Sequence, residues 1–133
     1  MKNSAVKSPS VGQSYKQTLT QIANQIEFEN FRCSDLHTLS EYDTAVSVVY
    51  IIAQIYQTPS HHMLRVNRAR LPAEQVAEVY RSLTYDHVAR VVKKFTEHTE
   101  PVQNVTAFLR TALFNAVCED GANRAQYGER WFE

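Results

Sequence analysis

The feature that most constrains the fold is a long apolar stretch between Glu41 and Gln57. It runs for about seventeen residues without Gly or Pro, and its apolar residues fall on more than one face of a helix. Its β-branched residues also suit a strand, but strands usually run only about 3–10 residues. Because a helix that is apolar all round is normally buried, the stretch predicts a central helix. Ser40 is its expected N-cap, and Asp43 completes an approximate capping box.

Shorter amphipathic stretches lie on both sides of this helix. Residues 1–13 are polar and are interpreted as a disordered tail or the remnant of a linker, and residues 14–133 as a single helical domain. A short helix that opens at Ser34 is a further expectation. The other predicted helices begin near Ser14, Pro72, Thr84 and Asn104, and the last of them ends before Gly121.

The segment from Met63 to Leu71 favours β-structure. Two short apolar runs flank Asn67-Arg68, where Asn tolerates the left-handed conformation of a tight turn and Arg68 stands in place of the preferred Gly. The chain has only 3 Gly and 4 Pro, too few for the many turns of an all-β protein. We therefore expect an all-α fold, a compact bundle of about five to six helices with one short β-hairpin near residues 63–71.

Signatures of catalysis, metal binding and cofactor binding are absent from the sequence. There is no GxSxG, no glycine-rich phosphate loop, and none of the five histidines forms HxxxH or HExxH. Asp86 and His87 are adjacent, so on a helix they point about 100° apart and do not form a base with its orienting partner. We expect a non-enzymatic protein without catalytic residues, metal or cofactor.

The cysteines and the apolar runs bear on the cellular compartment. Cys33 and Cys118 lie outside any CxxC and are expected to be free thiols, with Cys118 a small buried residue. The longest apolar run, Val48 to Ala53, is far shorter than the ~20 residues of a membrane span. The N-terminus has no apolar signal core. These features predict a cytoplasmic protein without a membrane partner.

Positive charge is concentrated in the middle of the chain. The whole chain has 14 basic and 14 acidic residues, yet residues 63–94 carry a net charge of +4. Cations two apart in a strand, or three and four apart in a helix, share a face and can neutralise DNA phosphates together. A solvated polar face is the alternative. The candidate DNA-contacting residues are Arg65, Arg68 and Arg70 in the predicted hairpin, with 68 and 70 projecting together, and Arg90, Lys93 and Lys94 in a later helix.

Two aromatic residues near the C-terminus are a second candidate. Tyr127 and Trp131 are four residues apart, and a last helical turn or two is expected to hold them on one face. Exposed aromatic rings stack on bases or anchor a protein partner. Packing of the two rings onto the core is the alternative.

A longer pattern runs from Val79 to Ala116. Leu83 precedes His87-Val88 and a run of charged residues, Val102 and Asn104-Val105 follow, and the pattern continues through Phe108-Leu109 and Ala112-Leu113-Phe114-Asn115. This pattern resembles the C-terminal domain of replication initiator protein A, found on plasmids and integrative elements of Gram-positive bacteria. The segment 64–76, LRVNRARLPAEQV, also resembles that family. Phenylalanine stands at 108 and 114, where the family commonly has Tyr.

The resemblance implies a helical domain similar in character to that of primosomal helicase-loading proteins. Such a domain contacts host replication proteins, namely a helicase loader or helicase, or DNA, or both. The winged-helix domain by which these initiators recognise the origin has no counterpart in the 133 residues, so origin recognition is not expected. The alternative is a structural protein–protein interaction or oligomerisation domain without DNA contact, with a second copy of the chain as a further partner.

Overall fold

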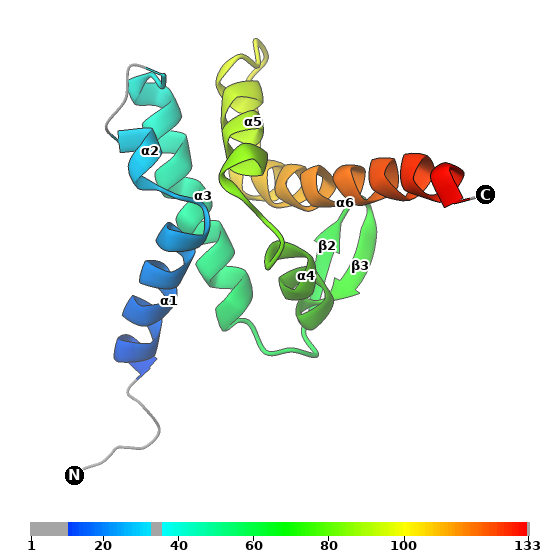
Figure 1. Cartoon of the computed structure of the whole chain (residues 1–133). Helices are drawn as coiled ribbons and strands as arrows, with labels where there is room; N and C mark the ends of the chain where they lie inside the picture. Colours follow the sequence, from blue (N-terminus) through cyan, green and yellow to red (C-terminus); the bar gives the residue numbers. More distant parts are fainter. Residues whose placement is uncertain (1–10, 33–35, 133) are drawn as a thin grey trace.

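The computed structural model describes residues 11–32 and 36–132, and their side chains over residues 15–32 and 36–120. This part of the chain is mostly helical, with one two-stranded antiparallel hairpin (Figure 1), which confirms the predicted fold class. None of the described helices is both long and apolar enough to cross a membrane. The elements are α1 (Val11–Gln25), α2 (Glu29–Arg32), α3 (Leu39–Gln57), β2 (Met63–Val66), β3 (Ala69–Pro72), α4 (Ala73–Tyr80), α5 (Tyr85–Thr96) and α6 (Val105–Phe132).

Helix α3 is the centre of the bundle. The other five helices all contact it, and Ala45, Val48 and Ile52 are completely buried. Its N-terminus differs from the prediction, because Thr38 is the N-cap and forms a capping box with Glu41. The Glu41 carboxylate accepts the Thr38 amide, and the Thr38 hydroxyl accepts the Glu41 amide. Glu is long enough to reach back to the N-cap amide, whereas the shorter Asp predicted for this role suits it less well.

The N-terminal helix α1 packs on α3 through the predicted apolar face, and Ile22 and Ile26 are completely buried. The helix begins at Val11, so Ser14 lies inside it and is not the N-cap. Residues 1–10 lie outside the described residues. So does Ser34, where a short helix was expected; the short helix α2 comes earlier in the chain.

The hairpin is confirmed at the predicted place. Val66 pairs with Ala69 next to a two-residue turn, and the turn residues Asn67 and Arg68 have φ values of 55° and 70°. The strands contact α4 and α6. Pro72 ends the hairpin as the N-cap of α4, one position before the predicted first turn. Thr84 and Asn104 occupy the expected N-cap positions of α5 and α6.

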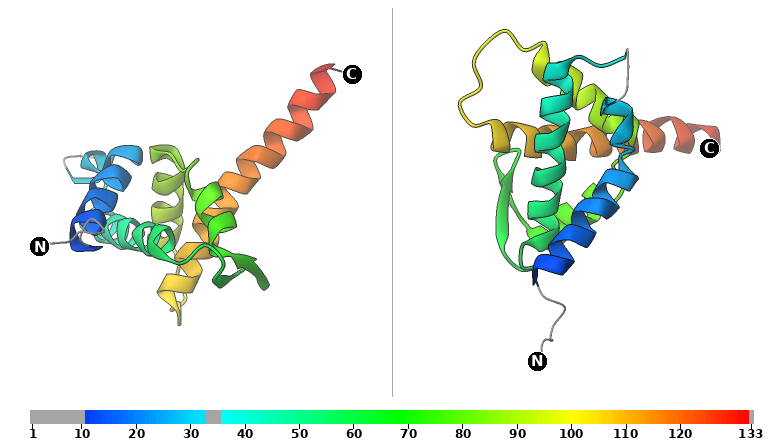
Figure 2. Two further views of the ribbon diagram at one scale, coloured as in Figure 1. Left: turned by 90° about the horizontal axis from the view of Figure 1, so that it is seen from below. Right: turned by 90° about the vertical axis from the view of Figure 1, so that its left-hand side faces the viewer.

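Helix α6 differs most from its prediction, because it runs without a break through Gly121 to Phe132. A single Gly costs a helix about 1 kcal/mol relative to Ala, which does not end it without a further helix-breaking residue. The C-terminal part of α6 extends away from the other helices (Figures 1 and 2). Tyr127 and Trp131 lie on this extension, and their side chains are outside the described residues.

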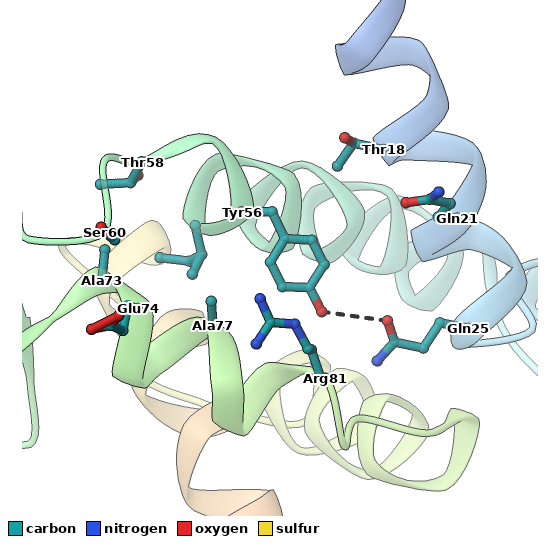
Figure 3. Close-up of a pocket in the computed structure, with 11 residues that line it drawn as sticks. Thr18, Gln21, Gln25, Tyr56, Thr58, Ser60, Ala73, Glu74, Ala77 and Arg81 are labelled. Atoms are coloured by element: carbon teal, nitrogen blue, oxygen red, sulfur yellow. Dashed lines mark hydrogen bonds between the residues drawn. The ribbon is translucent and has the colours of Figure 1, made fainter.

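Gln25 joins α1 to the connection between α4 and α5. Its amide Nε2 donates to the carbonyl oxygens of Tyr80 and Leu83, both at 2.9 Å. Its Oε1 accepts a hydrogen bond from the Tyr56 hydroxyl at 3.4 Å, at the edge of a polar pocket of about 450 Å³ (Figure 3). Burial raises the pKa of Tyr56 above its ordinary value, so the phenol stays protonated as the donor. One side chain thereby links α1, α3 and the connection between α4 and α5.

Replacing Gln25 by Ala is expected to lower the free energy of unfolding by about 1–3 kcal/mol, since two partly buried carbonyl groups lose a donor. Urea denaturation measures the change. Gln21→Ala is the matched control, because Gln21 lines the same pocket one turn earlier and its side chain makes no hydrogen bond within the described residues. An equal loss in both variants would contradict a specific role for Gln25.

Candidate functional site

The outer face of the hairpin carries two arginines directly opposite each other. The strand register pairs Arg65 with Arg70, and both side chains are exposed. The alternate positions face the helices, where Val66 is 1% exposed. Like charges directly opposite each other on a sheet are destabilising. The Arg65–Arg70 pair therefore does not stabilise the hairpin, which forms in spite of the repulsion between the two charges.

Arg68 stands in the turn, not in a strand. The expectation that Arg68 and Arg70 project together from one strand face is therefore wrong, because the alternation of a strand does not continue through a turn. The backbone of Arg68 is left-handed, with φ of 70°, a conformation that costs an ordinary residue roughly 1–2 kcal/mol. Arg68 places a third exposed cation at the tip of the hairpin.

The tip of the hairpin is fixed to α6 by a pair of amide hydrogen bonds. Asn67 Nδ2 donates to Asn115 Oδ1 at 2.6 Å, and Asn115 Nδ2 donates to Asn67 Oδ1 at 3.1 Å. Sequence reasoning singled out Asn67 as a turn residue and Asn115 as part of a family-like pattern, but nothing in the sequence pairs two residues 48 apart. These bonds hold Arg68 in a defined place.

The cations of α5 form a second group. Arg90, Lys93 and Lys94 are all exposed, as the helical spacing predicts. Arg90 is engaged, because its guanidinium lies 3.4 Å from the Asp120 carboxylate and its Nε donates to the Asp86 carbonyl at 3.3 Å. Lys93 and Lys94 have no acidic partner in the described part of the chain. They occupy the last turn of α5, where a positive charge interacts favourably with the negative end of the helix dipole.

Helix α6 separates the two groups of cations. Both α5 and β2 contact α6, and Figures 1 and 2 show α5 and the hairpin on different sides of it. The six predicted residues therefore form two surfaces. The hairpin arginines, Arg65, Arg68 and Arg70, are called the arginine hairpin below.

A buried histidine that the sequence singled out only as part of the family-like pattern joins α5 to α6. His87 is 6% exposed, and its Nδ1 accepts the Thr84 amide at 3.0 Å, so its Nε2 carries the proton and donates to Asp120 at 2.6 Å. The Thr84 hydroxyl also lies 3.1 Å from Nδ1, so the amide and the hydroxyl compete for the one lone pair of that nitrogen. These contacts connect the N-terminus of α5 to Asp120 of α6.

A second histidine makes a similar connection between α3 and α5. His37 lies 2.9 Å from the Glu41 carboxylate through Nδ1 and 2.6 Å from the Tyr85 hydroxyl through Nε2. Burial raises the pKa of Tyr85 above its ordinary value, and the nearby carboxylates act in the same direction. An activated tyrosine nucleophile needs a lowered pKa, so the raised pKa of Tyr85 favours a structural role for this contact.

The other reactive groups of the described residues are acidic side chains, histidines and Cys118, and they do not gather into a metal-binding site. Within the described residues, no three His, Cys, Asp or Glu side chains gather in a way that could hold a metal ion. Cys118 is exposed, so the expectation that it is buried is wrong. It lies two residues after the core residue Ala116, which turns it away from the core. Desolvation and the neighbouring Glu119 raise the pKa of its thiol, which disfavours the reactive thiolate.

Comparison of the chain with known protein families, with characterised proteins and with solved structures gives no match. The resemblance to initiator C-terminal domains therefore stays a prediction that rests on the motif residues.

Arg68→Gly is expected to raise the free energy of unfolding by about 0.5–1 kcal/mol, because Gly adopts a positive φ without a steric cost but is more flexible when unfolded. Arg68→Ala is the matched control, since it removes the same charge and keeps the Cβ atom. Urea denaturation measures both variants. Equal stabilisation by Ala and Gly would show that charge, and not the turn backbone, is responsible.

Asp120→Asn is expected to reduce the sensitivity of the fold to acid. The hydrogen bond from His87 lowers the pKa of Asp120 more than desolvation raises it, and the charges of His87 and Arg90 lower it further. Asp120 therefore contributes stability that is fully present above its unfolded pKa, near 3.8, and is lost as the pH falls through the lower folded value.

The measurement for Asp120 is the thermal midpoint as a function of pH. Wild type and Asp120→Asn are expected to differ at neutral pH and to converge in acid. Asp43→Asn, at an exposed position of α3, is the control and is expected to follow the wild type. A wild-type and an Asp120→Asn profile that stay parallel throughout would contradict the assignment.

Proposed function

We propose that the chain is a non-enzymatic, replication-initiation-associated module that binds DNA phosphates through the arginine hairpin and contacts host replication proteins through another surface. The helicase loader or the helicase is the host partner that the resemblance suggests.

The observation that carries the DNA proposal is the unfavourable placement of all three hairpin arginines. Arg65 and Arg70 repel each other across the strands, and Arg68 occupies a left-handed position that suits Gly. None of the three has an acidic partner within the described residues. Several residues placed unfavourably for stability in one region are typical of a functional site. Phosphate oxygens between the side chains would turn the repulsion into attraction.

The support beneath the hairpin also favours recognition of a large anionic ligand. The inner face packs on α4 and α6, and the Asn67–Asn115 bonds fix the tip. A rigid support reduces the entropy lost on binding, because only the arginine side chains have to become ordered. A two-stranded ribbon is also narrow enough to enter the major groove of B-DNA. The family-like segment 64–76 spans this hairpin, which supports the replication context.

A structural interaction or oligomerisation domain without DNA contact is the alternative function. It is favoured by one observation, a mostly apolar groove between α5 and α6. Asn115 lines this groove and also bonds the hairpin tip, but none of the three hairpin arginines lines it, so the two surfaces can be altered separately.

The test of the DNA proposal is binding of the full chain to labelled single- and double-stranded oligonucleotides over a range of salt concentrations. Arg65→Ala with Arg70→Ala should weaken binding and reduce the slope of log affinity against log salt by about two, since each lost phosphate contact contributes about 0.9 on duplex DNA. Stability should not fall, because the substitution removes a like-charge pair.

The charge-matched control is Lys16→Ala with Arg81→Ala, which removes two exposed cations from other parts of the surface. It should leave the salt slope close to that of the wild type. No binding to either oligonucleotide at low salt, or an equal loss in both double variants, would overturn DNA binding by the hairpin.

A further inference from the structure

A groove of about 710 Å³ lies between α5 and α6. Its floor is formed by Val91 from α5 and by Ala107, Phe108, Ala112 and Ala116 from α6. Three of these five residues are alanines, whose small side chains leave space between the two helices. The ring of Phe108 lies 5.6 Å from that of Phe95 and 5.6 Å from that of His98. The floor is thus apolar and held in place by ring contacts.

The α5 wall of the groove is cationic. Arg90 and Lys94, one helical turn apart, line this wall, whereas the neighbouring Lys93 does not. The charge of Arg90 is partly compensated by Asp120 at 3.4 Å, but Lys94 has no acidic partner within the described residues. Glu119 also lines the groove but forms no ion pair with Lys94, so among the described residues Lys94 is the uncompensated charge beside the apolar floor.

The shape of the groove fits a helix. Its α6 wall extends from Ala107 to Glu119, which corresponds to about 18 Å or about three helical turns at the α-helical rise. Apolar side chains at helical spacing that lie in such a groove are a common mode of peptide recognition. Nucleic acid fits this floor poorly, because phosphates and sugars would leave its apolar surface without complementary contacts.

We propose that the α5–α6 groove binds an amphipathic helix of a partner protein, with the apolar stripe of that helix on the alanines and Phe108 and a carboxylate against Lys94. Apolar side chains such as Leu fill the space left by the alanines. Glu or Asp at the edge of the stripe pairs with the ammonium group of Lys94. The helix is acidic on the side that faces α5. This inference names the partner surface of the proposed module and does not depend on DNA binding by the hairpin.

The probe is a synthetic peptide of about fifteen residues, with Leu and Ala at helical spacing on one face and Glu beside them, labelled with a fluorophore. Its binding to the full chain is followed by fluorescence anisotropy. A second peptide, with Lys in place of each Glu, tests the sign of the charge. The Glu peptide is expected to bind, and the Lys peptide to bind about fivefold or more weakly.

Two neighbouring lysines supply the matched pair of variants. Lys94→Glu is expected to weaken binding of the Glu peptide about fivefold or more, because attraction becomes repulsion. Lys93→Glu changes the net charge equally at an exposed position of the same helix but outside the groove, and is expected to change binding less than about twofold. Thr111→Phe, which fills the groove from a residue outside the core cluster, should abolish binding. Thermal unfolding of each variant checks that the fold is retained.

Several results would overturn the proposal. Equal effects of Lys93→Glu and Lys94→Glu would indicate general charge attraction. Peptide binding by a folded Thr111→Phe variant would place the peptide elsewhere. Displacement of the peptide by a DNA duplex at a similar concentration would make the groove part of the DNA surface. Self-association of the wild type that Lys94→Glu abolishes would identify a second copy as the occupant. DNA binding that is unchanged in the Arg65→Ala, Arg70→Ala variant, with retained peptide binding, would instead reject only the DNA proposal.

Discussion

The burial of most of α3, apart from one exposed stripe through Asp43, Ser47, Tyr50 and Gln54, is the constraint on which the rest of the structure depends. A helix whose apolar residues point in several directions cannot be covered by one neighbour, so it needs a shell of other elements. Helices α1, α2, α4, α5 and α6 supply this shell, and each contributes one apolar face to a common core. The hairpin packs on α4 and α6 at the side of this shell, which leaves its outer face free. The surfaces available for binding are therefore the outer faces of the shell, above all those around α6.

Polar side chains in this fold act mainly at the joints between elements. Gln25 connects α1 to the α4–α5 loop, His37 connects the start of α3 to α5, and His87 connects α5 to α6. Each is hydrogen-bonded at more than one atom, so its burial costs little and its geometry is well defined. The His87–Asp120 and His37–Tyr85 contacts fix the packing of neighbouring helices.

Two parts of the exposed surface next to α6 differ in chemistry. The arginine hairpin presents three cations from a rigid ribbon, and their arrangement opposes folding. The α5–α6 groove, which Asn115 connects to the hairpin tip, combines an apolar floor with one uncompensated lysine. The first surface suits an anionic ligand with regularly spaced charges, and the second suits an acidic amphipathic helix. If both proposals hold, a module with both surfaces holds a partner protein next to DNA, which the proposed replication-initiation role requires.

The sequence by itself determined the helical class, the central helix and the hairpin with its Asn67-Arg68 turn, because helical spacing, turn residues and caps act over a few neighbouring positions. It misplaced the cap of α3 and the end of α6, since these depend on which competing local signal packing favours. The pairing of Asn67 with Asn115, and of His87 with Asp120, was decided only by the tertiary structure. Residues 33 or more apart have no local pattern that brings them together, and the separation of the cations by α6 has the same origin. Local sequence sets which elements form, whereas packing around α3 decides which side chains share a surface.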